Sequence, residues 1–181
     1  MPIRFEFRPE KFVHAIAYLA DNCQGLTKMK ACKMLFFADK EHLQRFGRPI
    51  VGDHYYRLPH GPIPTRGLDM LRGNAKPSDR ALMEKHIGLV GDAIHLRSAA
   101  DETVFSKSDL EVLRETCRRY GSKTAAQLRS LSHRERAWTE AEENGPMDYA
   151  LFFGDDDSGR NMRDLVESEQ GTRDLLRPYR A

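Results

Sequence analysis

Residues 27–64, TKMKACKMLFFADKEHLQRFGRPIVGDHYYRLPHGPIP, constrain the fold more than any other stretch of this sequence. Thr27 can cap a helix, and Gly47 with Pro49 would end it, so we expect a helix to about Phe46. At about 100° per residue the apolar side chains of this helix form one broad stripe. Its members are Met29, Cys32, Leu35, Phe36, Leu43 and Phe46.

Asp39 falls inside this apolar stripe, four residues after Leu35 and four before Leu43. A buried carboxylate is costly unless it is hydrogen-bonded. The nearby donors are Arg48, a histidine, a tyrosine hydroxyl, or backbone N–H groups of residues 47–53. We interpret Asp39 as a structural latch that joins the helix to the Gly47–Pro49 turn.

A short strand and a proline-rich corner follow this helix. Residues 50–58 contain Tyr55 and Tyr56 and predict a strand that ends at Pro59. The corner at residues 59–64 contains Gly61 and Pro62, which fix the backbone and position the ring of His60. We therefore count Gly61 and Pro62 with Asp39, Gly47 and Pro49 as structural latch residues.

The remaining patterns predict a mostly helical α+β fold. Residues 87–90 and 93–96 flank Gly91-Asp92 as a hairpin, and we expect this hairpin to pair with the strand at 53–58 in a small antiparallel three-stranded sheet. Helical patterns cover residues 9–22, a short segment from Pro64, 106–120 with a capping box at its start, and 125–131. The polar residues 75–85 predict a loop that contains a short helical segment.

We expect one domain over residues 1–154 and a polar, loosely packed C-terminal tail over 155–181, with a polar helix at 161–169. The length of 181 residues suits a single core. The stretch from Leu26 to Arg48 is locally basic, but the formal net charge of the whole chain is only +2, so nucleic-acid binding is disfavoured. Three cysteines without a CxxC pair, no signal peptide and no long apolar run predict a cytoplasmic protein away from membranes.

No phosphate-binding loop, HExxH or GxSxG motif is present in the sequence. Asp39 and His42 lie three apart on the helix, and with Asp53, His54 and His60 they form a weak candidate for an oxygen–nitrogen metal site. An acid–base pair of Asp39 and His60 is equally conceivable. The alternative function is thus a small metal-dependent or acid/base hydrolase-like enzyme that uses Asp39 with His42 or His60.

The segment SHRERAW contains His133 and Trp138, the single tryptophan of the chain. A tryptophan after a short helix either closes the core over the helix ends or, if exposed, serves as a binding hot spot. From side-chain chemistry, the candidate partner-binding residues are Lys40, Arg48, His60 and Trp138.

The ordered motifs resemble the Panacea-domain, SocA-like antitoxin family. In this chain the motifs fall on Lys33 through Asp39, on Leu43, Gly47 and Pro49, on Tyr55 and Tyr56, and on Gly61, Pro62 and Ile63. FSKSDLEVLRETCRRYG and AAQLRSLSHRERAW are similar to two later segments of the family, so the resemblance covers about residues 10–141. One difference is His60, where the family often has a tyrosine.

The resemblance implies a non-enzymatic bacterial antitoxin that neutralises its cognate toxin by direct protein contact. It implies neither catalytic residues nor a cofactor or metal. The SocA-like branch is also associated with a proteolytic adaptor role, in which the toxin is handed to a AAA+ protease of the ClpXP type. The tail beyond Glu142 carries no recognised motif and could fit a particular toxin.

Overall fold

The computed structural model describes residues 3–176 and shows the predicted α+β, mostly helical class. This part of the chain forms eight α-helices, two short 3-10 helices and two small antiparallel sheets. In order the elements are α1 (Pro9–Asn22), α2 (Lys28–Phe46), β1 (Tyr55–Leu58), β2 (Gly61–Pro64), α3 (Thr65–Leu71), α4 (Pro77–His86), β3 (Ile87–Val90), β4 (Ala93–Leu96), η1 (Glu102–Val104), α5 (Lys107–Tyr120), α6 (Ala125–Ser132), α7 (Arg136–Thr139), η2 (Tyr149–Phe152) and α8 (Asp157–Leu176).

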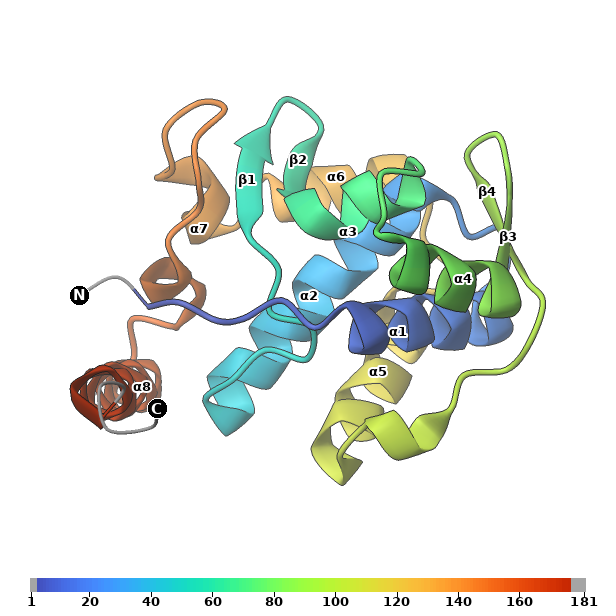
Figure 1. Cartoon of the computed structure of the whole chain (residues 1–181). Coiled ribbons are helices and arrows are strands. Elements are labelled where there is room, and N and C mark those ends of the chain that lie inside the picture. The colour runs from blue at the N-terminus through green and yellow to red at the C-terminus, as the bar shows by residue number, and fades with distance from the viewer. Residues whose placement is uncertain (1–2, 177–181) are drawn as a thin grey trace.

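Helix α2 lies at the centre, with the other elements packed around it (Figure 1). The Thr27 hydroxyl accepts a hydrogen bond from Lys30 N at 3.2 Å, and the helix ends at Gly47, whose φ is +70°. The ten residues 30–39 are all buried, so this part of α2 is covered on every side. One expected member of the apolar stripe is wrong: Phe46 is 40% exposed, because the last turn of α2 extends beyond the core.

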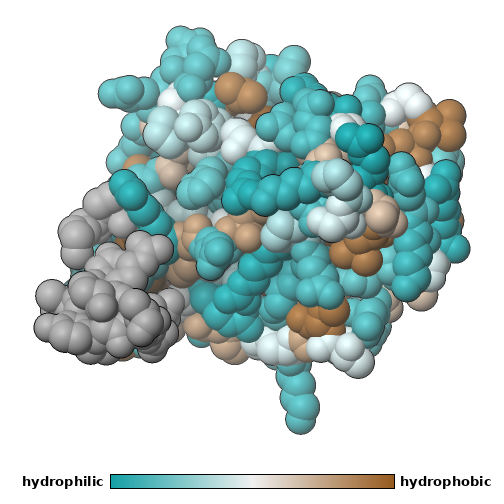
Figure 2. Space-filling model, viewed as in Figure 1, coloured by the Kyte–Doolittle hydropathy of each residue, from teal (hydrophilic) through white to brown (hydrophobic). Residues whose placement is uncertain are grey.

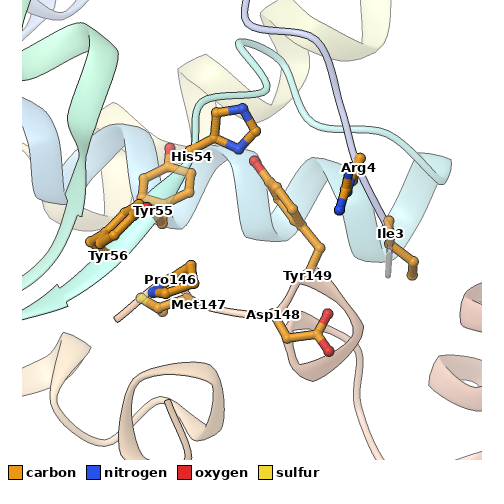
Figure 3. Close-up of a pocket in the computed structure, with 9 residues that line it drawn as sticks. All are labelled: Ile3, Arg4, His54, Tyr55, Tyr56, Pro146, Met147, Asp148 and Tyr149. Carbon is orange, nitrogen blue, oxygen red and sulfur yellow. The ribbon is translucent and has the colours of Figure 1, made fainter. Parts of the chain in front are cut away.

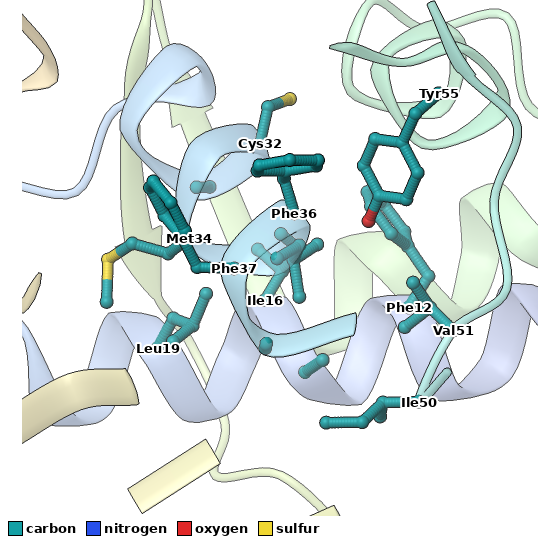
Figure 4. Packing of buried hydrophobic residues seen from close by; sticks show 14 of the residues in the cluster. Phe12, Ile16, Leu19, Cys32, Met34, Phe36, Phe37, Ile50, Val51 and Tyr55 are labelled. Carbon is teal, nitrogen blue, oxygen red and sulfur yellow. The ribbon is translucent and has the colours of Figure 1, made fainter. Parts of the chain in front are cut away.

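The hydrophobic core joins α1 to the middle of α2 and to the loop that follows it (Figure 4). Phe12, Ile16 and Leu19 of α1 are fully buried in this cluster, together with Phe36 of α2. The Phe36 ring contacts Tyr55 edge-on at a centroid distance of 5.4 Å. The core therefore holds the strand that follows α2 against the helix itself.

The sheet differs from the predicted three-stranded arrangement. Strand β1 pairs with β2 in the register Tyr55↔Pro64 and Leu58↔Gly61, so the expected corner is itself a strand and Pro59-His60 is the turn. Prolines donate no backbone hydrogen bond, which confines them to an edge strand such as β2. The predicted strand over residues 50–58 begins only at Tyr55.

The hairpin β3–β4 forms around Gly91-Asp92 as predicted, but its expected partner is wrong. It contacts the segment before α2, where Lys28 N donates to Asp92 O and Ile94 N donates to Leu26 O. The second edge of β1 is taken by residues 144–147 instead: Arg57 N donates to Gly145 O and Met147 N donates to Tyr55 O.

Two further helices differ from the expectations in length. Residues 77–86 form α4, with Pro77 in the first turn and the side chains of Met83 and His86 buried, so the helix is longer than the short segment predicted within this loop. Helix α8 is longer than the predicted helix at 161–169. Its Val166 is buried, and Gln170 exchanges two hydrogen bonds with the backbone of Arg4.

The domain boundary at residue 154 and the loose packing of the tail stay predictions, and residues 177–181 of that tail lie outside the described residues. Among the described helices, none has the length and apolar content needed to cross a bilayer. The face in Figure 2 is mostly hydrophilic, with an apolar area over the β3–β4 hairpin at its right edge, where Leu89 and Val90 are exposed.

Candidate functional site

Asp39 is fully buried on α2 and is surrounded by hydrogen-bond donors. Its Oδ1 accepts from Ile50 N at 2.8 Å and Val51 N at 2.9 Å. Its Oδ2 accepts from Gly52 N at 3.2 Å and from the Tyr55 hydroxyl at 3.0 Å. Burial raises the pKa of this carboxyl to about 6, although the four hydrogen bonds favour the ionised form. The carboxylate thus holds the loop after the Gly47–Pro49 turn against α2.

Asp53 is a second buried carboxylate, and its side chain caps the N-terminus of helix α3. Its Oδ2 accepts from Gly67 N at 2.6 Å, and its Oδ1 accepts from Arg66 N at 3.1 Å and His54 N at 2.6 Å. Burial raises its pKa as well. From the sequence, Asp53 is only a candidate metal ligand. Its capping role could not be predicted, because a carboxylate that caps a helix beginning twelve residues later leaves no local sequence pattern.

His42 and Arg48 meet a third buried carboxylate, Asp109 of α5. The Oδ1 atom of Asp109 lies 3.0 Å from His42 Nε2 and 2.9 Å from Arg48 Nη2, and Lys11 pairs with Oδ2. Burial opposes ionisation, yet these neighbours hold the pKa of the Asp109 carboxyl well below its usual range. The sequence identified Asp109 only as part of the capping box, which the structure contains.

Lys33 is a buried cation that the apolar pattern of α2 did not reveal. Its side chain has no exposed surface, and Nζ donates one hydrogen bond to Pro62 O at 2.7 Å. Burial lowers the pKa of this ammonium to about 7. Gly61 has a φ of +93°, and a Cβ at this position would lie 2.7 Å from Ser132 Oγ and 2.8 Å from Lys33 Nζ. The Gly61-Pro62 pair therefore packs directly on α2 and α6.

His60 and Trp138 lie at the same end of the β1–β2 hairpin. His60 is exposed in the turn, and Trp138 is half-buried, with its Nε1 donating to Leu58 O at 3.4 Å. The Trp138 ring stacks on His133 at a centroid distance of 4.0 Å, and the Arg57 guanidinium lies 4.6 Å from the same ring. We call Arg57, His60, Arg129, His133 and Trp138 the tryptophan surface.

The other two candidate partner-binding residues each form an ion pair. Lys40 pairs with Glu135, the residue before α7, so it lies on the side of the molecule that carries Trp138. Arg48 pairs with Asp109 on the α5 side. The structure thus brings Lys40, His60 and Trp138 to the elements around α7 and places Arg48 apart from them.

A family model described as the SocA-like antitoxin, Panacea domain, matches residues 32–139. The chain belongs to this family. The match begins within α2 and ends with α7, so it includes the buried Lys33 and Asp39, the β1–β2 hairpin and Trp138. Helix α1, η2 and α8 lie outside the matched Panacea domain. No curated protein and no solved structure matches the chain.

A half-open cavity of about 310 Å³ lies where this Panacea domain meets its flanking segments (Figure 3). One wall is His54, Tyr55 and Tyr56 of the family-matched part, and the others are Ile3 and Arg4 and residues 146–149. The Tyr149 hydroxyl is fixed by donation to Asp53 O at 2.6 Å. The cavity is thus bounded largely by segments outside the match.

The three residues considered for a hydrolase function, Asp39, His42 and His60, lie in different surroundings in this Panacea protein. Asp39 bonds residues 50–52 and Tyr55, whereas His42 contacts Arg48, Ser108 and Asp109. His60 is exposed in the hairpin turn. Among the side chains that the structure describes, no three from His, Cys, Asp or Glu form a group that could hold a metal ion. Asp39, His42 and His60 therefore do not form one site.

Proposed function

We propose that this protein is the antitoxin of a bacterial toxin–antitoxin pair and neutralises its cognate toxin by direct protein contact. The observation that carries the proposal is the match of the SocA-like antitoxin, Panacea domain to residues 32–139. This span covers most of the central helix and the whole β1–β2 hairpin, so the matched part includes the middle of the core.

The tryptophan surface is the contact that we assign to the toxin. Tryptophan and arginine are the residue types most enriched at binding hot spots. The guanidinium of Arg57 bonds the carbonyls of Thr139 and Ala141, and that of Arg129 bonds Pro59 O, so these bonds neutralise neither charge with a carboxylate. An acidic region on the toxin would complement these cations.

Lys40 belongs at the edge of this contact, since its ion pair with Glu135 lies beside α7. Arg48 is assigned a smaller role, because its pairing with the buried Asp109 stabilises the fold on the α5 side. A partner that covers the tryptophan surface leaves Arg48 uncovered or near the rim. Substitution of Arg48 should then affect folding stability more than toxin binding.

The proteolytic adaptor role is the second part of the proposal. It rests on the SocA-like character of the matched domain. In this role the antitoxin binds the toxin and a ClpXP-type AAA+ protease at the same time. The toxin half-life in cells should then shorten when the antitoxin is present, and this shortening should require the protease. A half-life that does not depend on the antitoxin would limit its role to neutralisation by binding.

The experiment co-expresses the protein with the product of the neighbouring reading frame and measures growth and co-purification. His60→Ala should weaken both rescue and co-purification, because the substitution removes part of the proposed contact surface. The side chain is exposed, so its loss should leave the fold intact. His95→Ala is the matched control, since His95 is likewise an exposed histidine of a hairpin, although it lies in strand β4 and not in the turn.

Trp138→Phe tests the same surface with less disturbance of packing than alanine. Thermal unfolding of each variant separates loss of binding from loss of folding. If the neighbouring product arrests growth and the wild-type protein neither relieves the arrest nor co-purifies with it, the antitoxin proposal is wrong. If the wild-type protein rescues growth and the tryptophan-surface variants do so equally well, the toxin contact lies elsewhere on the protein.

A further inference from the structure

The C-terminal ends of α1 and α5 are joined by a buried lysine. Lys30 of α2 is 5% exposed, and its Nζ donates to Gln24 O at 2.9 Å and to Gly121 O at 2.6 Å. Gln24 follows the C-cap residue of α1, and Gly121 is the C-cap residue of α5. The ammonium group therefore fixes these two helix ends side by side.

Two cysteine thiols lie at this junction. Cys23 is the C-cap residue of α1, directly after Asn22, and Cys117 lies in the last turn of α5. A hydrogen bond with the Cys117 thiol, aided by the charge of Lys30, lowers the pKa of Cys23 although burial opposes this, and the same contact raises the pKa of Cys117. A Cβ on Gly121 would lie 3.0 Å from Cys23 Sγ, so the glycine leaves space for the sulfur.

We propose that Cys23 and Cys117 form a reversible thiol–disulfide site whose oxidant is a hydroperoxide. At this junction the Cys23 sulfur lies beside the turn that contains Cys117 and Gly121, next to the buried ammonium of Lys30. A cysteine near a cation with a second thiol beside it is the arrangement found at peroxide-reactive sites. Cys23 is 7% exposed, which suits an oxidant as small as hydrogen peroxide, and Cys117 is half-buried. Lys30 is the positioning residue.

The reaction takes two steps. The Cys23 thiolate attacks one oxygen of hydrogen peroxide, an S–O bond forms, the O–O bond breaks, and hydroxide leaves. The Cys117 sulfur then attacks the sulfur of the Cys23 sulfenic acid, the S–S bond forms, and the S–O bond breaks. Water carries away the oxygen and the thiol proton. In sum, two thiols lose two electrons and two protons, and one peroxide becomes two waters.

The third cysteine provides an internal comparison. Cys32 is fully buried in the core on α2, and burial raises its pKa to about 12. Its thiol is therefore protonated and shielded from reagents, and it should remain reduced under conditions that oxidise the other two. A small thiol such as dithiothreitol should return the oxidised site to its starting state by thiol–disulfide exchange.

The test exposes the full-length protein to a small molar excess of hydrogen peroxide, unfolds it, and alkylates the free thiols. We expect the three thiols of the chain to fall to one, with peptides containing Cys23 and Cys117 linked in the mass spectrum. Dithiothreitol should restore all three. Retention of three thiols, a link to Cys32, or links only between two molecules would overturn the proposal.

Three variants make the test specific. Cys32→Ala should form the disulfide as the wild type does, whereas Cys117→Ser should stop at a Cys23 sulfenic acid that dimedone traps. In Lys30→Met the rate of disulfide formation should follow the same curve against pH but shifted to higher pH. An unshifted curve would contradict the role of Lys30, and a missing dimedone adduct would contradict the role of Cys23.

Discussion

Asp39 has no exposed surface and accepts four hydrogen bonds. Its replacement by asparagine therefore tests how much these hydrogen bonds contribute to the stability of the fold. The asparagine oxygen can still accept from Ile50 N and Val51 N, but its NH₂ group would replace the oxygen that accepts from Gly52 N and from the Tyr55 hydroxyl. The hydroxyl can turn to accept from the NH₂ group, whereas the N–H of Gly52 cannot. One buried donor then lacks an acceptor. We expect Asp39→Asn to lower the free energy of unfolding by about 2 kcal/mol.

Urea unfolding at neutral pH measures this change. Tyr55→Phe removes one donor and no acceptor, and should cost about 1 kcal/mol. Asp21→Asn, at an exposed position on α1, should change the stability by less than about 0.5 kcal/mol. Equal stabilities for Asp39→Asn and Asp21→Asn would show that the hydrogen bonds to Asp39 contribute nothing.

Among single residues, helical periodicity revealed Asp39 and not Lys33. A carboxylate inside an apolar stripe is visible in the sequence, and the backbone N–H groups that bond Asp39 lie only 11 to 13 residues later in the chain. Lys33 belongs to a locally basic stretch, where a lysine is ordinarily solvated. Its burial depends on β2 and α6, which reach it from residues 62 and 132. Local patterns carry no information about such distant contacts.

At the scale of elements, the β1–β2 hairpin depends on a close approach at Gly61. Gly61 and Gly73 have nearly equal φ angles, +93° and +91°. A Cβ at Gly61 would meet Ser132 Oγ at 2.7 Å and Lys33 Nζ at 2.8 Å, whereas a Cβ at Gly73 would meet nothing within 4 Å. The two positions therefore separate backbone strain from steric contact.

We expect Gly73→Ala to cost about 1 kcal/mol, the cost of placing a side chain in the left-handed region. Gly61→Ala should cost at least about 2 kcal/mol more, because the hairpin must also move away from α2 and α6. Chemical denaturation of both variants measures the difference. Similar losses for the two variants would mean that the hairpin is not closely packed at Gly61.

Strand pairing was the least predictable part of the elements. The sequence indicated the β3–β4 hairpin and its turn, because a Gly-Asp dipeptide between apolar runs is a local signal. The neighbours of β1 could not be predicted in this way. Residues 144–147 are Asn-Gly-Pro-Met, which lack the alternating pattern of a strand, and their hydrogen bonds to β1 join backbone groups of Arg57 and Tyr55. Backbone hydrogen bonds require no particular side chains.

For the whole molecule, Lys33 should make stability depend on pH above neutrality. Its pKa is about 7 in the folded protein and 10.5 for an ordinary lysine. Between these values the unfolded chain holds a proton that the folded chain has released. The free energy of unfolding should therefore rise with pH across this window, by about 1.4 kcal/mol for each pH unit between the two pKa values.

Urea unfolding at several pH values between 7 and 9.5 measures this slope. Lys33→Met removes the titrating group and should flatten the curve, while Lys76→Met, at an exposed position, should leave it unchanged. Parallel curves for wild type and Lys33→Met would show that Lys33 titrates at the usual lysine pKa.

The burial of ten consecutive residues of α2 has a consequence for how such a protein can change its partner over evolution. A substitution in residues 30–39 alters core packing or a buried charge, so its first effect is on folding. A new binding preference must then arise from segments that can vary without that loss. Here those are the exposed hairpin turn at His60, the solvent-facing side of α7, and exposed positions such as Arg4 and Asp148 in the segments that flank the 310 Å³ cavity.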